Sequence, residues 1–248
     1  MRTKRTIVIG FVAMILAGSA MAGQAKTRLF ILSGQSNMRN FNHSTTFMPA
    51  LEKAFPDDKI IAVKSAQGGQ PIMRWYKKWH APEGQEEALK KVLSKDNKRP
   101  MVIGDLYEKL IAAIDGRIKD KKIDTITFLW MQGESDASKA KSAIYKEAMA
   151  GLIKQLRDDL KCPGMSVVIG RISDCHKGKP DWDVVRKAQE DVAAEDPLTV
   201  WVNTDDLNDG VSKKTGKKFD RGLHYTRDGY DELGRRFAAE SVKLLQAK

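Results

Sequence analysis

A serine that follows a glycine-containing turn is the residue in this sequence best placed to act as a nucleophile. The apolar run 29–32 is too short for a helix and leads into Ser33-Gly34, which favours a buried strand ending in a tight turn. Ser36 then lies beyond the carboxyl end of this strand, where ligands bind in an open α/β sheet. A serine hydroxyl becomes an effective nucleophile when a base takes its proton and fixed donors stabilise the oxyanion. The chemistry to expect is acyl transfer, if other loops supply these groups.

Further polar motifs also come directly after predicted strands. The carboxyl ends of parallel strands share one edge of a sheet, so residues far apart in the sequence are expected to meet there. Paired glycines in one of these motifs allow a close backbone approach to a bound molecule. The motifs are Gln67-Gly68-Gly69, Gln132-Gly133-Glu134, Ser173-Asp174 and Asp205-Asp206.

The elements that would hold these motifs alternate between strands and helices. This order implies a parallel sheet, and continuously apolar strands imply that helices cover both of its faces. We therefore expect an α/β protein, a three-layer α/β/α sandwich with a five-stranded parallel sheet. Strands are predicted at 29–32, 60–63, 123–130, 165–172 and 199–203, helices at 49–55, 106–118, 138–160, 183–194 and after Thr226, and irregular segments at 39–48 and 81–100.

The first 22 residues have the pattern of a secretory signal peptide. A basic start precedes an apolar run from Ile7 to Ala17, and Ala20-Met21-Ala22 offers a small-residue cleavage site. The run is shorter than the roughly 20 residues of a membrane span, and an uncleaved N-terminal anchor is the alternative. We expect a secreted or periplasmic protein with one domain over residues 23–248 and no stable membrane anchor.

The formal net charge of +11 includes three charges from Arg2, Lys4 and Arg5 in the signal segment. The other basic residues are spread along the chain, which is typical of a solvated surface, and attraction to an acidic polymer is the functional alternative. No recognisable motif favours nucleic acid as a partner. The oligomeric state is not indicated by the sequence.

Two cysteines flank the predicted strand 165–172. At about 3.3 Å per residue this strand separates its ends by more than about 20 Å, whereas a disulfide needs Cα atoms about 5.5 Å apart. We therefore expect Cys162 and Cys175 to be free thiols. No histidine pairs with them at metal-ligand spacing, so neither a metal site nor a cofactor is expected.

Four motifs occur in a fixed order between residues 28 and 230: Gly34-Gln35-Ser36-Asn37-Met38, Gln67-Gly68-Gly69, Trp130-Met131-Gln132-Gly133-Glu134-Ser135-Asp136 and Leu223-His224-Tyr225-Thr226. With these motifs the sequence resembles the SGNH hydrolases, and within them the sialate O-acetylesterase-like and acetylxylan esterase group of carbohydrate esterases. The resemblance implies a flavodoxin-like SGNH hydrolase fold. It also implies a secreted serine esterase that hydrolyses O-acetyl esters on carbohydrates through an acyl-enzyme.

The resemblance implies Ser36 as the nucleophile and His224 as its base. It implies an oxyanion hole formed by the Ser36 backbone N–H, an N–H of Gly68 or Gly69, and the side-chain amide of Gln132.

The acid that orients His224 is less clearly defined, because Arg221 stands where the family usually has an aspartate. Asp220 lies one residue earlier and could reach His224 if Gly222 lets the loop bulge. Glu134 is the rival, and a backbone carbonyl or a pseudo-enzyme are the remaining alternatives.

The candidates for substrate binding are polar and aromatic residues near the motifs. Aromatic side chains can stack on sugar rings, although at this spacing they are common in a core. Arginines can hold an acidic substrate or pair with carboxylates nearby. The candidates are Gln35, Asn37, Arg74, Trp75 and Arg171, with Tyr76 and Trp79 as further aromatic residues, and we expect His43, His80 and His176 to be solvated.

The expected partner is an acetylated carbohydrate, with acidic polysaccharides among the candidates. A GDSL-type esterase or lipase acting on other short-acyl esters is the alternative enzyme. A non-catalytic glycan-binding protein with a decayed site is the alternative from another class.

Overall fold

The computed structural model describes residues 24–84, 86–87, 102–137, 141–211, 216 and 218–247. The predicted signal peptide lies outside these residues, as do positions 138–140 of one predicted helix and 88–100 of the predicted polar excursion. In the described ranges, no helix combines the length and apolar character that crossing a membrane requires.

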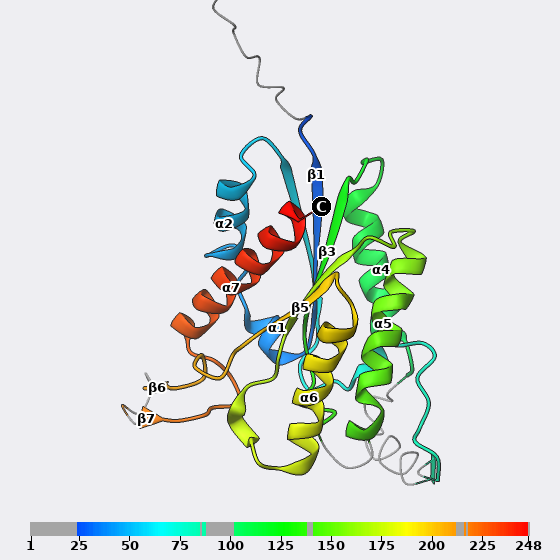
Figure 1. Cartoon of the computed structure of the whole chain (residues 1–248), viewed down its shortest axis with the longest axis vertical. Helices are drawn as coiled ribbons and strands as arrows, with labels where there is room; N and C mark the ends of the chain where they lie inside the picture. The colour runs from blue at the N-terminus through cyan, green and yellow to red at the C-terminus, as the bar shows by residue number, and fades with distance from the viewer. Residues whose placement is uncertain are drawn as a thin grey trace, which may run out of the picture.

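In the described part of the chain, five parallel strands form one sheet in the order β2-β1-β3-β4-β5 (Figure 1). The prediction of a five-stranded parallel sheet is confirmed. Gly34 at the end of β1, the second strand in this order, pairs with Ala66 of β2 on one side and Met131 of β3 on the other, so three strand ends lie side by side. The strands are β1 (Thr27–Gly34), β2 (Lys59–Ala66), β3 (Thr125–Met131), β4 (Ser166–Gly170) and β5 (Thr199–Val202).

Helices cover both faces of the sheet and complete the predicted three layers (Figure 1). Alternate residues of β1 point to opposite faces: Leu29 and Ile31 join one apolar core, while Phe30 and Leu32 join the other. The first core includes residues of α4 (Asp105–Ile118), α5 (Tyr145–Asp159) and α6 (Pro180–Glu195), and the second includes residues of α2 (Phe47–Ala54) and α7 (Arg227–Gln246).

Several short elements were not predicted. The segment expected as a loop from residue 39 begins inside a helix, α1 (Ser36–Asn40). A two-stranded antiparallel sheet joins β6 (Gly210–Val211) to β7 (Lys218–Phe219), and the single turns η1 (Ile72–Arg74), η2 (Ser142–Ile144) and η3 (Asp174–His176) connect longer elements. These elements are too short to show a periodic apolar pattern.

Two other expectations are met. The last helix, α7, begins directly after Thr226 as expected, and the Thr226 hydroxyl caps it by accepting a hydrogen bond from the Gly229 N–H at 3.0 Å. Cys162 and Cys175 are both free.

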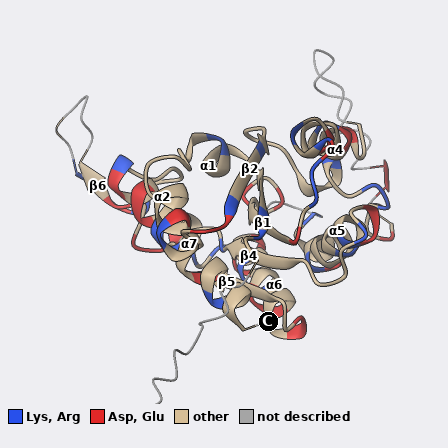
Figure 2. Ribbon diagram, turned by 90° about the horizontal axis from the view of Figure 1, so that it is seen from above, with Lys and Arg blue, Asp and Glu red and all other residues tan. Residues whose placement is uncertain are grey.

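The charged residues of the outer helices are mixed in sign. Basic and acidic segments alternate on α4, α5 and α7 (Figure 2), so none of these three helices has a surface of a single charge sign.

Candidate active site

A glycine at the end of β1 determines where Ser36 lies. The φ angle of Gly34 is +140°, and a Cβ atom there would lie only 2.0 Å from the Met131 carbonyl oxygen. Only glycine fits this close approach, which lets the Gln35 N–H donate to the same oxygen at 2.9 Å. The chain then enters α1 at once, so Ser36 begins this helix at the carboxyl edge of the sheet.

A cleft of about 510 Å³ lies over this edge. Its walls come from the ends of β1, β2, β3 and β4 and from the segment before α7. As the shared edge of a parallel sheet predicts, residues from all four motifs meet here. The predicted site residues that line it are Gln35, Ser36, Gly68, Gly69, Glu134 and His224.

Arg39 and His176 also line the cleft, although the sequence analysis did not place them there. Arg39 lies one helical turn after Ser36, and its guanidinium packs so close to Gly68 that a Cβ there would lie 3.0 Å from Nη1. His176, expected to be solvated, lines the cleft in η3, with its ring edge-on to Trp182 at 4.9 Å between centroids. A prediction of helix α1 would have placed Arg39 in the cleft, one turn after Ser36. The signal for His176 was its position two residues after the strand-end motif Ser173-Asp174.

Ser36 and His224 face the same cleft from elements 188 positions apart in sequence numbering. Among the described residues, no hydrogen bond joins the Ser36 hydroxyl to the His224 ring. Hydrogen bonds between a nucleophile and its base are often long without substrate and tighten when substrate binds. The placement therefore permits the pairing that a serine nucleophile needs.

Asn37 ties three parts of the site together from inside the protein. The residue is 1% exposed, and its Nδ2 donates to Glu134 Oε1 at 2.8 Å and to the Leu223 carbonyl at 3.1 Å. Its Oδ1 accepts a hydrogen bond from the Tyr230 hydroxyl at 2.9 Å. The prediction that Asn37 binds substrate is therefore corrected: its amide is used within the protein, and it holds Glu134 beside the backbone that precedes His224.

Glu134 reaches this position through a second obligatory glycine. Gly133 has a φ of +151°, and a Cβ there would lie 2.8 Å from a methyl carbon of Val185. Although Glu134 lines the cleft, its Oε2 is enclosed and has no hydrogen-bond partner within the described residues. Burial raises the pKa of this carboxyl to about 7, against the opposing effect of hydrogen bonds that include the one from Asn37.

Asp220 has a different environment. It is exposed, it does not line the cleft, and within the described residues no hydrogen bond connects it to His224. The left-handed backbone in this loop is at Arg221, with φ +50°, rather than at Gly222, where the sequence suggested a bulge. The Arg221 N–H donates to Asp209 at 2.6 Å, which stabilises that turn.

Gln132 does not face the cleft. Its side chain is completely buried, and its Nε2 donates to the Gln70 carbonyl at 3.0 Å and to Asp136 at 2.5 Å. The Tyr145 hydroxyl donates to Gln132 Oε1 at 3.1 Å. The expectation that Gln132 completes the oxyanion hole is corrected, because its amide donors are engaged inside the protein.

Arg74, Trp75 and Arg171 also lie in the interior rather than in the cleft. Arg74 forms an ion pair with Asp105 and donates to Gln70 at 2.7 Å. Trp75 is 1% exposed and packs edge-on against Trp130, and Trp79 is 7% exposed. Arg171 forms ion pairs with Glu190 and Asp205. Each of these residues therefore has the structural role named as its alternative: the arginines pair with nearby carboxylates, and the tryptophans pack in the core.

The described residues contain no group of three or more histidine, cysteine, aspartate or glutamate side chains arranged to hold a metal ion.

Ionisation of Glu134 and Asp136 opposes folding. Burial raises the pKa of Glu134 to about 7 and that of Asp136 to about 6. The folded protein therefore binds more protons than the unfolded chain between about pH 4 and pH 7, and its stability falls as pH rises through this window. Glu134→Gln removes one of these ionisable groups, so we expect the Tm of this variant minus the Tm of the wild type to increase from pH 5 to pH 8. Each kcal/mol of difference in the free energy of unfolding should shift this Tm difference by about 2–4 °C. Thermal unfolding of both proteins checks this, and a Tm difference that is independent of pH would contradict it.

The fold and the site together define a class of protein: a hydrolase of the SGNH group, with its candidate serine after the first strand and its candidate histidine before the last helix. The chain belongs to the carbohydrate esterase family described as SASA, sialic acid-specific acetylesterase, whose model matches residues 39–243. No curated protein gives a significant match.

Solved structures with low sequence identity to this chain share its fold. A protein from Arabidopsis thaliana is 21% identical, with a TM-score of 0.61 and coverage of 87% of this chain and 98% of that one. A carbohydrate acetylesterase from Xanthomonas citri is 16% identical, with a TM-score of 0.62 and coverage of 90% and 57%. NanS is 12% identical, with a TM-score of 0.61 and coverage of 90% and 99%. At these identities the similarity establishes the fold.

Proposed function

We propose that this carbohydrate esterase is a serine enzyme that removes O-acetyl groups from an acidic sugar, and that it acts outside the cytoplasm after loss of residues 1–22. The observation that carries the proposal is the single cleft lined by Ser36, His224 and the backbone of Gly68 and Gly69. A nucleophile, a base and backbone donors at one strand edge are the parts that ester hydrolysis requires.

The proposed reaction has two halves. His224 takes the proton of the Ser36 hydroxyl while Oγ attacks the acetyl carbonyl carbon, and the oxyanion is stabilised by backbone N–H groups of Ser36 and of Gly68 or Gly69. The C–O bond to the sugar breaks, and the imidazolium gives its proton to the departing sugar oxygen. Water, deprotonated by His224, then attacks the acetyl-serine, which releases acetate and restores Ser36.

We propose Glu134 as the carboxylate that orients His224. Its support is the shared amide of Asn37, which bonds both Glu134 Oε1 and the carbonyl of Leu223, the residue directly before His224. The unpartnered Oε2 leaves one carboxylate oxygen available to an imidazole N–H. Asp220 remains the alternative, because it is close to His224 in the sequence.

The proposed acidic substrate is supported by Arg39. Within the described residues no carboxylate pairs with this exposed cleft arginine, which lies one helical turn from Ser36. A carboxylate on the sugar can therefore bind Arg39 while its acetyl ester lies at the serine. Sialic acid, the sugar in the family description, carries such a carboxylate.

Replacing Arg39 with glutamine should raise KM for an O-acetylated sialic acid by about 10- to 100-fold, because charge-assisted hydrogen bonds contribute about 1.5–3 kcal/mol. The KM for uncharged 4-nitrophenyl acetate should stay unchanged. Steady-state kinetics on both esters measures this, with Arg117→Gln, an exposed arginine on α4, as the matched control. Equal losses on both esters would mean that Arg39 supports the cleft rather than the sugar carboxylate.

The whole proposal is tested by acetate release from O-acetylated sialic acid together with labelling by a fluorophosphonate, which reacts with activated serines. Preference for octanoate over acetate esters would instead indicate a GDSL-type lipase, and glycan binding without labelling would indicate a decayed site. N-terminal sequencing of the mature protein tests export, with Gly23 as the expected first residue.

A further inference from the structure

The segment that carries His224 has few packing contacts of its own. Leu223 is 42% exposed and His224 is exposed, while the next residue, Tyr225, is only 6% exposed. Burial therefore fixes the chain after the histidine but not before it. A misplacement of about 1 Å in a catalytic group can cost about 100-fold in rate, so specific contacts must position this segment on its other side.

One such contact is the hydrogen bond from Asn37 Nδ2 to the Leu223 carbonyl at 3.1 Å, and Asn208 supplies the contacts to the residue before Leu223. The Nδ2 of Asn208 donates to the Gly222 carbonyl at 3.0 Å, and the Gly222 N–H donates back to the Asn208 carbonyl at 3.0 Å. Both backbone groups of the residue two positions before His224 are thus held by one asparagine, which is itself completely buried. The residue before Gly222 is also held, since the Arg221 N–H donates to the Asp209 carboxylate at 2.6 Å.

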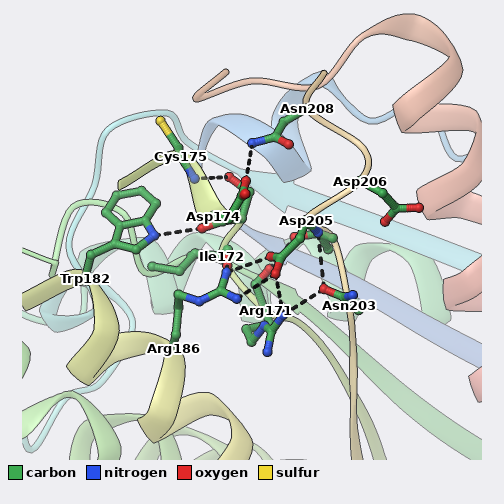
Figure 3. A network of polar contacts seen from close by, with 12 residues as sticks. Arg171, Ile172, Asp174, Cys175, Trp182, Arg186, Asn203, Asp205, Asp206 and Asn208 are labelled. Carbon is green, nitrogen blue, oxygen red and sulfur yellow. Dashed lines mark hydrogen bonds and ion pairs between the residues drawn. The ribbon is translucent and has the colours of Figure 1, made fainter. Parts of the chain in front are cut away.

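Asp174 fixes the orientation of the Asn208 amide. The same Nδ2 donates to Asp174 Oδ1 at 3.1 Å (Figure 3). The amide nitrogen therefore faces two oxygens that can only accept, one from Asp174 and one from the Gly222 carbonyl. A flipped amide would place an oxygen against both acceptors. Asp174 lies in η3, two residues before the cleft residue His176, so this contact links the β4 wall of the cleft to the His224 segment.

An ion-pair cluster of two buried arginines and the partly buried Asp205, below Asn208 in the view of Figure 3, holds the segment that carries Asn208. Asp205 accepts hydrogen bonds from Arg186 at 2.7 and 2.8 Å and from Arg171 at 3.0 Å. Burial alone would raise the pKa of Asp205, but the hydrogen bond from Arg186 and the charges of both arginines lower it below its usual value. The carboxylate therefore stays ionised at neutral pH and anchors the chain three residues before Asn208.

We propose that Asn208, oriented by Asp174, is a positioning residue that sets the place of His224 in the cleft. The inference rests on the proposed function in that it takes His224 as the base. Asn208 touches neither substrate nor the reacting atoms. It acts by fixing Gly222, which is separated from His224 by Leu223 alone.

Asn208→Ala should lower kcat by about 10- to 100-fold and leave KM within about twofold, because the loss falls on proton transfer. Asn208→Asp should lose at least as much, since it places carboxylate oxygens against Asp174 and the Gly222 carbonyl. Asp174→Asn should stay close to wild type because it keeps an acceptor oxygen, whereas Asp174→Ala should follow Asn208→Ala. Asp206→Asn is the control. Asp206 lies on the same segment as Asn208, and its replacement weakens the ion pair with Arg236 of α7 without changing a contact to the His224 loop.

Histidine NMR gives a readout that does not depend on activity. The ring signals of His224, assigned with His224→Ala, should shift or broaden in Asn208→Ala and remain unchanged in Asp206→Asn. If the wild type releases no acetate, the proposed function fails, while these signals still test the positioning. If His224→Ala is inactive but Asn208→Ala keeps wild-type kcat and unchanged signals, the positioning inference is overturned and the function stands. A kcat loss that appears equally in Asp206→Asn would also overturn it.

Discussion

Replacing Ser36 with alanine abolishes ester hydrolysis and leaves the fold intact. The hydroxyl is the only atom group removed, and it faces the cleft rather than the core. Loss of a serine nucleophile lowers kcat by roughly 10⁴-fold or more, down to the level supported by binding and oxyanion donors alone. Acetate release and fluorophosphonate labelling should both disappear, while thermal unfolding stays close to that of the wild type.

Ser33 offers a matched control for this variant. It lies three residues earlier, near the end of β1, is completely buried, and donates its hydroxyl hydrogen to the Ser65 carbonyl at 2.7 Å. Ser33→Ala should therefore cost about 1 kcal/mol of stability and leave kcat nearly unchanged, the reverse of Ser36→Ala. Wild-type acetate release in Ser36→Ala would place the nucleophile elsewhere.

The fold was predictable because its strands are buried on both faces. The run Leu29–Leu32 is apolar at every position, since alternate side chains enter two separate cores, and such runs indicate a covered parallel sheet. The helix α1 was not predictable in this way. It is a single turn fixed by the contact of Gly34 with Met131, and that contact joins strands about a hundred residues apart in the sequence.

The site was predictable as a set of loops but not as a set of side-chain directions. The shared strand edge brings Ser36, Glu134 and His224 to one cleft, as expected. Whether a side chain enters that cleft depends on partners that sequence spacing does not reveal. Gln132 turns inward because Asp136 and the Gln70 carbonyl accept its amide hydrogens.

The prediction with the second largest effect concerns the acid. Glu134→Gln should lower kcat by roughly 10³- to 10⁴-fold, because a carboxylate that accepts from the imidazole fixes its tautomer and stabilises the imidazolium. Asp220→Asn should cost less than about 10-fold, since Asp220 is exposed and no hydrogen bond joins it to His224 within the described residues. The two variants are compared with His224→Ala by kcat on one acetyl ester.

The pH dependence gives this assignment a second test. Only the ionised carboxylate carries the negative charge that stabilises the imidazolium, and burial raises the pKa of Glu134 to about 7. Wild-type kcat/KM should therefore rise as the pH increases through about 7, and Glu134→Gln should lose the part of that rise due to the carboxyl group.

Asp136 provides the control for a purely structural effect. It is a buried carboxylate in the same turn, but its contacts are to Gln132 and to the Ile72 N–H at 2.9 Å rather than to the cleft. Asp136→Asn should therefore change the free energy of unfolding more than it changes the pH profile of kcat/KM.

A different ranking of the variants would reassign the acid. If Asp220→Asn approaches the loss in kcat of His224→Ala while Glu134→Gln is mild, Asp220 is the acid and its loop must close on the histidine when substrate binds. Two mild effects would assign the orienting role to a backbone carbonyl, because the imidazole would then need neither carboxylate.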